Sequence, residues 1–264
     1  MAVKDTVSER HARKKLAAQG FRVERIPRAS GRTADYGVSD EFNHYLIEVI
    51  QPQALTFLSD LEGKARQEGI SSGTRAFSEY SGKIKDIVYD KSSQLRETAA
   101  HRPGYRILWL ASPRMKSKLF TVKESDCFAR QLERKLYGTV RLNVFGATDK
   151  APELRRCFYY NPFLFDATCD LNAVIFATPR GYKLFVNALN ADADSFRITK
   201  LYSLFMPSSV VDPRLHEQDG RTLFVSLEAD RSSPGAQWND LARRYGIQTS
   251  VTIPYEWHGM ATVE

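Results

Sequence analysis

Residues 35 to 51 read Asp35-Tyr-Gly-Val-Ser-Asp-Glu-Phe-Asn-His-Tyr-Leu-Ile-Glu-Val-Ile-Gln51, and this stretch decides the fold expected for the chain. Residues 34–38 and 44–50 are rich in apolar and β-branched side chains, which predicts two strands. Residues 39–43 between them are mostly polar and suit a hairpin loop. One acidic residue, Asp35, comes early in the first strand, and a second, Glu48, comes late in the next strand among apolar neighbours.

The register of this hairpin brings the two acids together. If the turn is centred between Glu41 and Phe42, Asp35 lies directly opposite Glu48, and opposed residues share a face with Cβ atoms about 4.5–5.5 Å apart. Buried carboxylates are costly unless they are paired, hydrogen-bonded or bound to a metal. The pair therefore predicts a site for a hard divalent cation, Mg²⁺ or Mn²⁺, which prefers oxygen ligands. The structural alternatives are a strand-end cap at Asp35 and an ion pair between Glu48 and an Arg or Lys.

The sequence around the hairpin predicts further elements of the same sheet. Before it, residues 7–19 predict a helix, and alternating apolar and charged residues at 21–26 predict a strand. After it, the expected elements are a helix at 54–66, a loop at 69–82, a helix at 83–99 and a nearly continuous apolar strand at 105–111. A continuous apolar strand is typical of the centre of a sheet that is covered on both faces.

The second half of the chain predicts mixed α and β structure. Helices are expected at residues 122–137, 194–204 and 236–245, and strands at 139–145, 156–160, 172–178, 182–188, 222–227 and 248–253. The fold class is therefore α/β, in the sense of an α+β mixed sheet. A chain of 264 residues forms one large domain or two small ones. The division expected here is a core with a basic helical extension at 1–146 and an α+β domain at 147–264.

The order of elements in residues 7–111, with Asp35 and Glu48-Val49, resembles the PD-(D/E)XK nuclease superfamily. In that family an Asp starts the second strand, and an acidic-x-Lys triplet ends the third. The lysine position holds Ile50 here, which departs from the pattern. The resemblance implies a restriction-endonuclease-like αβββαβ core and a Mg²⁺-dependent endonuclease, a hydrolase of DNA phosphodiester bonds. It also implies metal ligation by Asp35 and Glu48 and fits a role in restriction or defence against foreign DNA.

The helix after the hairpin offers a replacement for the absent lysine. Lys91 is four residues after Ile87, three after Val88 and four before Leu95, so it lies on the apolar stripe of the helix. Some members of the superfamily place the lysine on this following helix, and Lys91 is therefore the third expected catalytic residue. Gln94, one turn further on, is expected to support the site. The alternative is that Lys91 extends from the edge of the stripe into solvent.

Two other residues are expected in supporting roles. Gln51 follows the third strand, and strand alternation places it on the opposite face from Glu48 unless a bulge shifts it. Glu9 lies on the first helix, where members of this superfamily often carry a supporting acid. The simpler role for Glu9 is to complement the dipole of the first helical turn.

Positive charge is concentrated in one part of the chain. The net charge is +7, and residues 101–150 alone hold eleven Lys/Arg against four Asp/Glu. A local positive excess predicts a polyanionic partner, DNA first and RNA as an alternative, although an ordinary solvated face has the same composition. The expected nucleic-acid contacts are Arg75, in a Ser/Gly-rich anion-binding turn beside the active cleft, and Arg114, Lys116 and Lys118.

The remaining features concern location and partners. No apolar run is long enough to span a membrane, no signal peptide is expected, and three scattered cysteines indicate reduced thiols, so the expected location is cytoplasmic. Aromatic residues at 158–165 predict core packing or an interface, through which the second half would form a homodimer or a larger complex. The alternative function is a catalytically inactive nuclease fold that binds nucleic acid or a protein partner.

Overall fold

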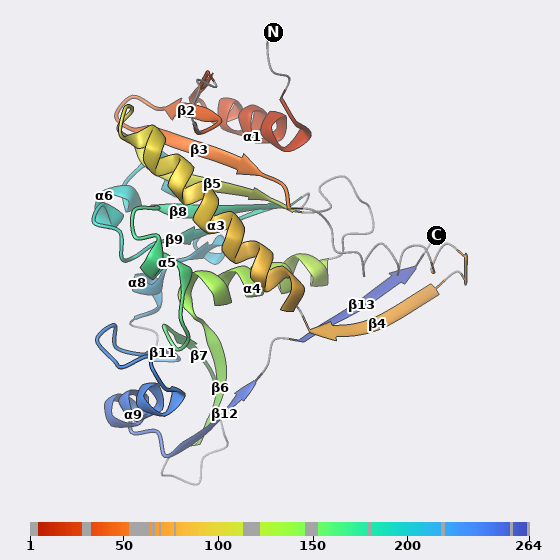
Figure 1. Ribbon diagram of the computed structural model, residues 1–264, viewed down its shortest axis with the longest axis vertical. Helices are drawn as coiled ribbons and strands as arrows, with labels where there is room; N and C mark the ends of the chain where they lie inside the picture. The colour runs from red at the N-terminus through yellow and green to blue at the C-terminus, as the bar shows by residue number, and fades with distance from the viewer. Residues whose placement is uncertain are drawn as a thin grey trace.

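Among the described residues, the main sheet has seven strands in the order β1-β2-β3-β5-β8-β9-β10 (Figure 1). The computed structural model describes residues 5–27, 33–52, 64, 67–68, 70–76, 78–112, 122–145, 153–178, 181–217, 220–253 and 256–262. The mixed sheet and the order of its elements confirm the expected α/β class.

The first four elements form as the sequence predicts. They are α1 (Val7–Ala18), β1 (Arg22–Arg25), β2 (Tyr36–Ser39) and β3 (His44–Ile50). The helix begins with a capping box, in which Thr6 and Glu9 satisfy each other's backbone N–H groups. The helix ends before Gly20, which has a φ of 76° that glycine adopts without strain. The three strands pair in antiparallel order, so the hairpin is the centre of a meander.

Helix α3 (Ser78–Ala99) and strand β5 (Tyr105–Ala111) complete the core order. Strand β5 lies between β3 and β8 (Ala173–Thr178) and is parallel to both. Its last five residues are buried because both faces of the sheet are covered. Strand β9 (Gly181–Val186) pairs with β8 as a hairpin, and β10 (Val210–Val211) forms the far edge.

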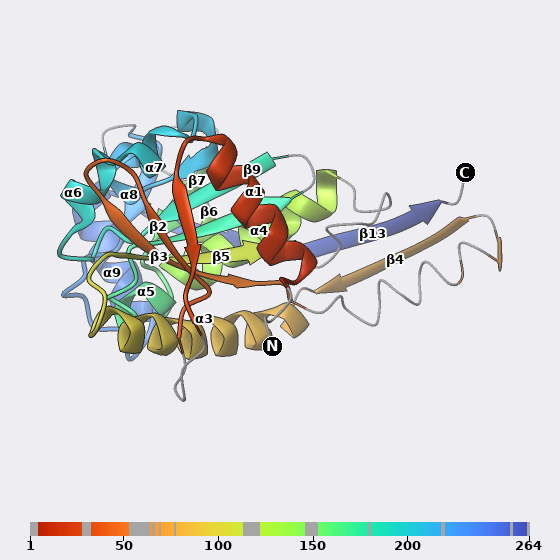
Figure 2. The same cartoon turned by 90° about the horizontal axis from the view of Figure 1, so that it is seen from above.

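The two faces of the main sheet carry separate apolar cores. On one face, Leu46 and Leu108 pack with Ile84, Val88 and other residues of α3. On the other face, the neighbouring sheet residues pack against α1 and against the short helices α6 (Ala193–Arg197) and α7 (Lys200–Ser203). Figure 2 shows α1 and α3 on opposite sides of the strands. A side chain in β3 therefore faces either α1 or α3, and alternation along the strand decides which.

A second sheet of four strands has the order β11-β7-β6-β12. Its strands are β6 (Val140–Phe145), β7 (Glu153–Phe158), β11 (Thr222–Phe224) and β12 (Thr249–Ile253). Two longer helices, α4 (Val122–Tyr137) and α9 (Pro234–Tyr245), accompany it, and the short helices α5 (Leu164–Ala167), η1 (Pro207–Ser209) and α8 (Pro213–His216) lie in the connections. The expected aromatic packing is confirmed, because Phe158, Tyr159, Phe163 and Phe165 are buried.

The expected loop at residues 69–82 is wrong. Residues 70–76 form strand β4 (Ile70–Ala76), which pairs in antiparallel fashion with β13 (Glu256–Thr262), and α3 begins at Ser78. Figures 1 and 2 show this two-stranded ribbon projecting from the rest of the molecule. Its partner strand is more than 170 residues away in the sequence, so local composition could not indicate the pairing.

The single helix expected at residues 194–204 is also wrong. It is divided into α6 and α7, and Thr199 between them caps the second helix by accepting a hydrogen bond from the Tyr202 N–H at 3.3 Å. A Thr at this position competes with continued helix because its hydroxyl bonds the backbone. The helix expected at 54–66 lies almost entirely outside the described residues.

The division at residue 147 stays a prediction. Strands β8, β9 and β10 from the second half belong to the same sheet as β1, β2, β3 and β5, and β6 from the first half belongs to the second sheet. Within the described part of the chain, no helix has the length and apolar character needed to cross a bilayer. The cytoplasmic location and the association through the second half likewise stay predictions.

Candidate active site

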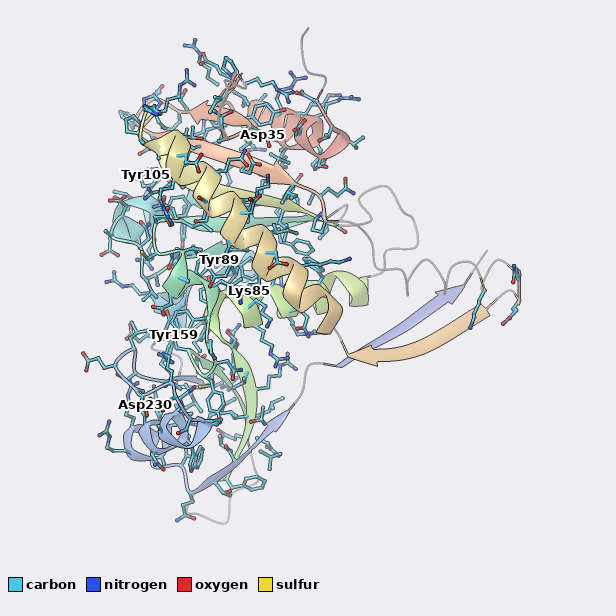
Figure 3. All side chains as sticks on the ribbon, in the orientation of Figure 1. Asp35, Lys85, Tyr89, Tyr105, Tyr159 and Asp230 are labelled. Carbon is cyan, nitrogen blue, oxygen red and sulfur yellow. The ribbon has the colours of Figure 1, made fainter. Side chains whose placement is uncertain are left out.

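The hairpin β2–β3 places Asp35 and Glu48 opposite each other. Tyr36 pairs with Ile47, so the next pair outward joins Asp35 to Glu48, which is the register predicted from the sequence. Both side chains are buried, with relative exposures of 6% and 3%. The Val49 N–H donates a hydrogen bond to Asp35 Oδ2 at 2.9 Å, which anchors the carboxylate across the hairpin. Figure 3 labels Asp35 on the strand side of α3.

Lys91 of α3 extends toward this pair. Its Nζ lies 3.0 Å from Glu48 Oε1, and its side chain is only 20% exposed. The alternative in which Lys91 extends into solvent is therefore wrong for this structure. Lys91, which the sequence places on the apolar stripe of α3, therefore contacts the carboxylate of Glu48.

Gln94 holds Lys91 and Glu48 in one hydrogen-bonded group. Lys91 Nζ donates to Gln94 Oε1 at 3.1 Å, and Gln94 Nε2 donates to Glu48 Oε2 at 2.9 Å. Gln94 Nε2 also donates to the Thr33 carbonyl oxygen, just before Asp35. Because both carboxylate oxygens of Glu48 have a donor, its orientation is well defined.

The charges around Glu48 determine how readily its carboxyl group ionises. Burial, followed by the negative charge of Asp35, raises the pKa of Glu48 to about 7, whereas Lys91 acts in the opposite direction. One ammonium cannot neutralise two ionised carboxylates. A divalent cation would remove the remaining negative charge and would favour ionisation of Glu48.

The donor set fits a hard cation such as Mg²⁺. Asp35 and Glu48 supply carboxylate oxygens, and Mg²⁺ is commonly held by one or two carboxylates with water completing its shell. Among the residues that the structure describes, no group of three or more His, Cys, Asp or Glu side chains is arranged to hold a metal. Asp35 and Glu48 are the candidate ligands because they lie opposite each other on the hairpin.

Glu9 and Gln51 lie outside this group of contacts. Glu9 Oε2 accepts a hydrogen bond from the Thr6 N–H at 2.6 Å and lies 3.7 Å from Arg25 Nη2. Gln51 Oε1 accepts from the Ser8 hydroxyl at 2.9 Å, so Gln51 lies on the α1 face of the sheet, as strand alternation predicts. Glu9 has the contacts of a helix cap, and Gln51 joins α1 to the end of β3. Their supporting roles in catalysis stay predictions.

The expected nucleic-acid contacts are only partly described. Arg75 lies in β4, opposite Trp257 of β13, and not in an anion-binding turn, so that structural expectation is wrong. Arg114, Lys116 and Lys118 lie outside the described residues.

Thr98 is a structural support that the sequence reasoning missed. Its hydroxyl accepts from the Ala34 N–H at 2.8 Å and donates to the Gln94 carbonyl at 2.9 Å. The hydroxyl therefore connects α3 to the backbone immediately before Asp35. Its position four residues after Gln94 placed it on the same helical face, and that spacing was the available signal.

The structure thus places two carboxylates on an antiparallel hairpin of a mixed sheet and a lysine on the following helix, as the sequence predicts. No family model matches the chain, and no curated protein matches it. Among solved structures, the chain is similar to Hjc, a Holliday junction resolvase from Archaeoglobus fulgidus, with 18% sequence identity and a TM-score of 0.26. The match covers 42% of this chain and 70% of that chain.

Proposed function

We propose that this protein is a Mg²⁺- or Mn²⁺-dependent nuclease that hydrolyses DNA phosphodiester bonds, with Asp35, Glu48 and Lys91 as catalytic residues. The observation that carries the proposal is the 3.0 Å contact between Lys91 Nζ and Glu48 Oε1, beside the opposed Asp35. Lys91 of α3 thereby provides the positive charge that Ile50 of β3, an apolar residue, does not.

Each side chain has a distinct role in this proposal. Asp35 and Glu48 would hold the cation, which when bound would lower the pKa of a water molecule and stabilise charge on the phosphate. Lys91 would donate hydrogen bonds to the attacking water or to a phosphate oxygen, and its fixed positive charge favours the more negative transition state. Gln94 is a positioning residue because it bonds both Lys91 and Glu48.

DNA is the proposed substrate because the chain carries a net charge of +7 and concentrates that excess in residues 101–150. This charge is common to binding of DNA and RNA. The substrate assay therefore includes supercoiled plasmid, single- and double-stranded oligonucleotides, and RNA of matched sequence.

The test is cleavage by the purified chain in Mg²⁺ or Mn²⁺, with EDTA as the blank. We expect Asp35→Asn, Glu48→Gln and Lys91→Met each to reduce the cleavage rate by about 100-fold or more, as removal of a transition-state contact does. Lys83→Met is the matched control, because Lys83 is an exposed lysine on the same helix. Its rate should equal that of the parent chain.

Two outcomes would contradict the proposal in different ways. Cleavage that survives both Asp35→Asn and Glu48→Gln would show that this hairpin is not the active site. Salt-sensitive DNA binding by a parent chain that cuts neither DNA nor RNA in either metal would favour the alternative, a nuclease fold that binds without cutting.

A further inference from the structure

A groove of about 460 Å³ lies between the second sheet and its neighbours. Its charged lining residues come from four elements: Arg130 and Glu133 of α4, Arg141 of β6, Arg155 and Arg156 of β7, and Lys183 of β9. None of these elements carries Asp35, Glu48 or Lys91. Figure 1 shows β6 and β7 in the lower half of the molecule and the β2–β3 hairpin in the upper half.

Two arginines of this groove are direct cross-strand partners. Arg141 of β6 pairs with Arg156 of β7, which places both side chains on the same face of the sheet. Like charges directly opposite each other destabilise a sheet. A concentration of positive charge at such a position is favourable only when negative charge lies close to it.

Glu133 supplies part of that negative charge from beneath the groove. It is 7% exposed, and its Oε1 lies 3.4 Å from Arg156 Nη1. Burial raises the pKa of Glu133, while Arg156, Lys183 and Arg141 act against this shift, so all three cations lie close to the carboxylate. Arg155 is paired separately with Glu153 at 2.8 Å. Among the described residues, the lining of the groove therefore holds five cations and one carboxylate, Glu133, with Glu153 paired to Arg155 beside it.

Arg156 is held in place by more than its ion pair. Its Nη2 lies 3.3 Å from His216 Nε2, and its guanidinium carbon lies 5.2 Å from the centre of the Phe158 ring. Phe158 and His216 stack on each other, with ring centres 6.0 Å apart. Arg156 therefore loses little side-chain freedom on binding a ligand, which favours affinity.

We infer that this groove binds the sugar–phosphate backbone of a nucleic acid. The groove is separate from the site of Asp35 and Glu48. Guanidinium groups match phosphate oxygens with paired hydrogen bonds, and a concave surface of one charge concentrates the attraction. The inference extends the proposed nuclease function by adding a backbone-binding surface, and it requires binding only, not cleavage.

The test measures binding in EDTA, where the proposed metal-dependent cleavage cannot occur. Fluorescence anisotropy of a labelled duplex is recorded over a range of NaCl concentrations. The groove variant carries Arg141→Ala and Lys183→Ala, and the control carries Lys14→Ala and Arg243→Ala, which remove two exposed cations from α1 and α9. Thermal unfolding of each variant confirms that it is folded, and Arg141→Ala alone serves if the double variant is not.

The groove variant should bind more weakly, and its slope of log K against log salt should fall by about 2, or by about 1 for Arg141→Ala alone. The control should keep the parent slope. Equal slopes for the parent and groove variants would overturn the inference. So would competition by poly-glutamate as strong as that by unlabelled duplex, because that result would identify the groove as a site for acidic protein segments. If the parent chain cuts no nucleic acid but the groove variant still shows the reduced salt slope, the result would count against the proposed nuclease function and not against the groove.

Discussion

Glu48 is the residue of the candidate site whose ionised form is disfavoured in the folded protein. It is buried beside another carboxylate, and its pKa is raised to about 7. A structural acid with a single strong cationic partner would instead have a lowered pKa. The pKa of Glu48 is raised because Lys91 does not fully offset burial and the charge of Asp35. A destabilised ionised acid is typical of functional sites.

This raised pKa predicts a pH-dependent stability. The folded protein binds a proton at Glu48 more readily than the unfolded chain, whose pKa is near the ordinary 4.5. The stabilisation is therefore fully present below about pH 4.5 and is lost as the pH rises through about 7, on the order of 3 kcal/mol in total. In EDTA, Glu48→Gln should unfold at a higher temperature than the parent chain at about pH 8.

The control for this prediction is Glu41→Gln, an exposed acid in the hairpin loop. It should respond to pH as the parent chain does. Thermal unfolding followed by circular dichroism at about pH 5 and about pH 8 gives the comparison. A Glu48→Gln chain with the same pH response as the parent would show that Glu48 is not destabilised when ionised.

At the scale of elements, α3 does more than cover the sheet. Its apolar stripe packs on the face that carries Glu48, and the same helix supplies Lys91, Gln94 and Thr98. A side chain on the stripe necessarily faces the strands, so helix packing positions the site.

The loop after α4 depends on the backbone conformation of one glycine. Gly138 has a φ of 63°, and its carbonyl accepts hydrogen bonds from the Tyr160 and Asn161 N–H groups at 3.1 Å each.

We predict that Gly138→Ala destabilises the protein by about 2–4 kcal/mol. A Cβ at this position would collide with the Asn161 backbone, in addition to the cost of a left-handed conformation. Gly246→Ala is the matched control, since Gly246 has a φ of 62° with nothing within 4 Å of the added Cβ. It should cost only about 1 kcal/mol. Urea unfolding of the two variants measures the difference, and equal costs would contradict the collision.

At the scale of the whole molecule, the halves of the sequence are joined through shared sheets. Strand β8, from the second half, pairs in parallel with β5 from the first, over residue pairs from Ile107–Ala173 to Ala111–Ala177. The Tyr137 hydroxyl lies 2.8 and 2.7 Å from the carbonyl oxygens of Val186 and Val211 and can donate to either, so α4 is tied to β9 and β10. The main sheet therefore depends on residues from both sides of position 147.

This organisation predicts that residues 1–146 do not fold alone. Without β8, strand β5 would expose an apolar edge and lose the cover of its neighbours, which promotes aggregation. The expressed fragment should lack a cooperative thermal transition, whereas the full chain should unfold in a single one. A soluble fragment with cooperative unfolding would instead support an independent domain at 1–146.

The hairpin and its register follow from the sequence itself. Strand alternation and a short polar loop are local features, and they specify which side chains share a face. The helices at 83–99 and 122–137 were likewise predicted, because periodic apolar residues mark the buried face wherever the helix packs. The sequence placed Lys91 on the apolar stripe of its helix but did not decide whether its side chain reaches the acids or extends into solvent.

The tertiary structure alone decided the remaining features. It directed Lys91 to Glu48, paired β4 with β13, and gathered Arg130, Arg141, Arg156 and Lys183 around Glu133. These contacts join residues from separate elements, and their energies depend on packing and charge that no local pattern contains. The sequence by itself determined a hairpin with two facing acids, and the packing of α3 on that hairpin determined which cation completes the group.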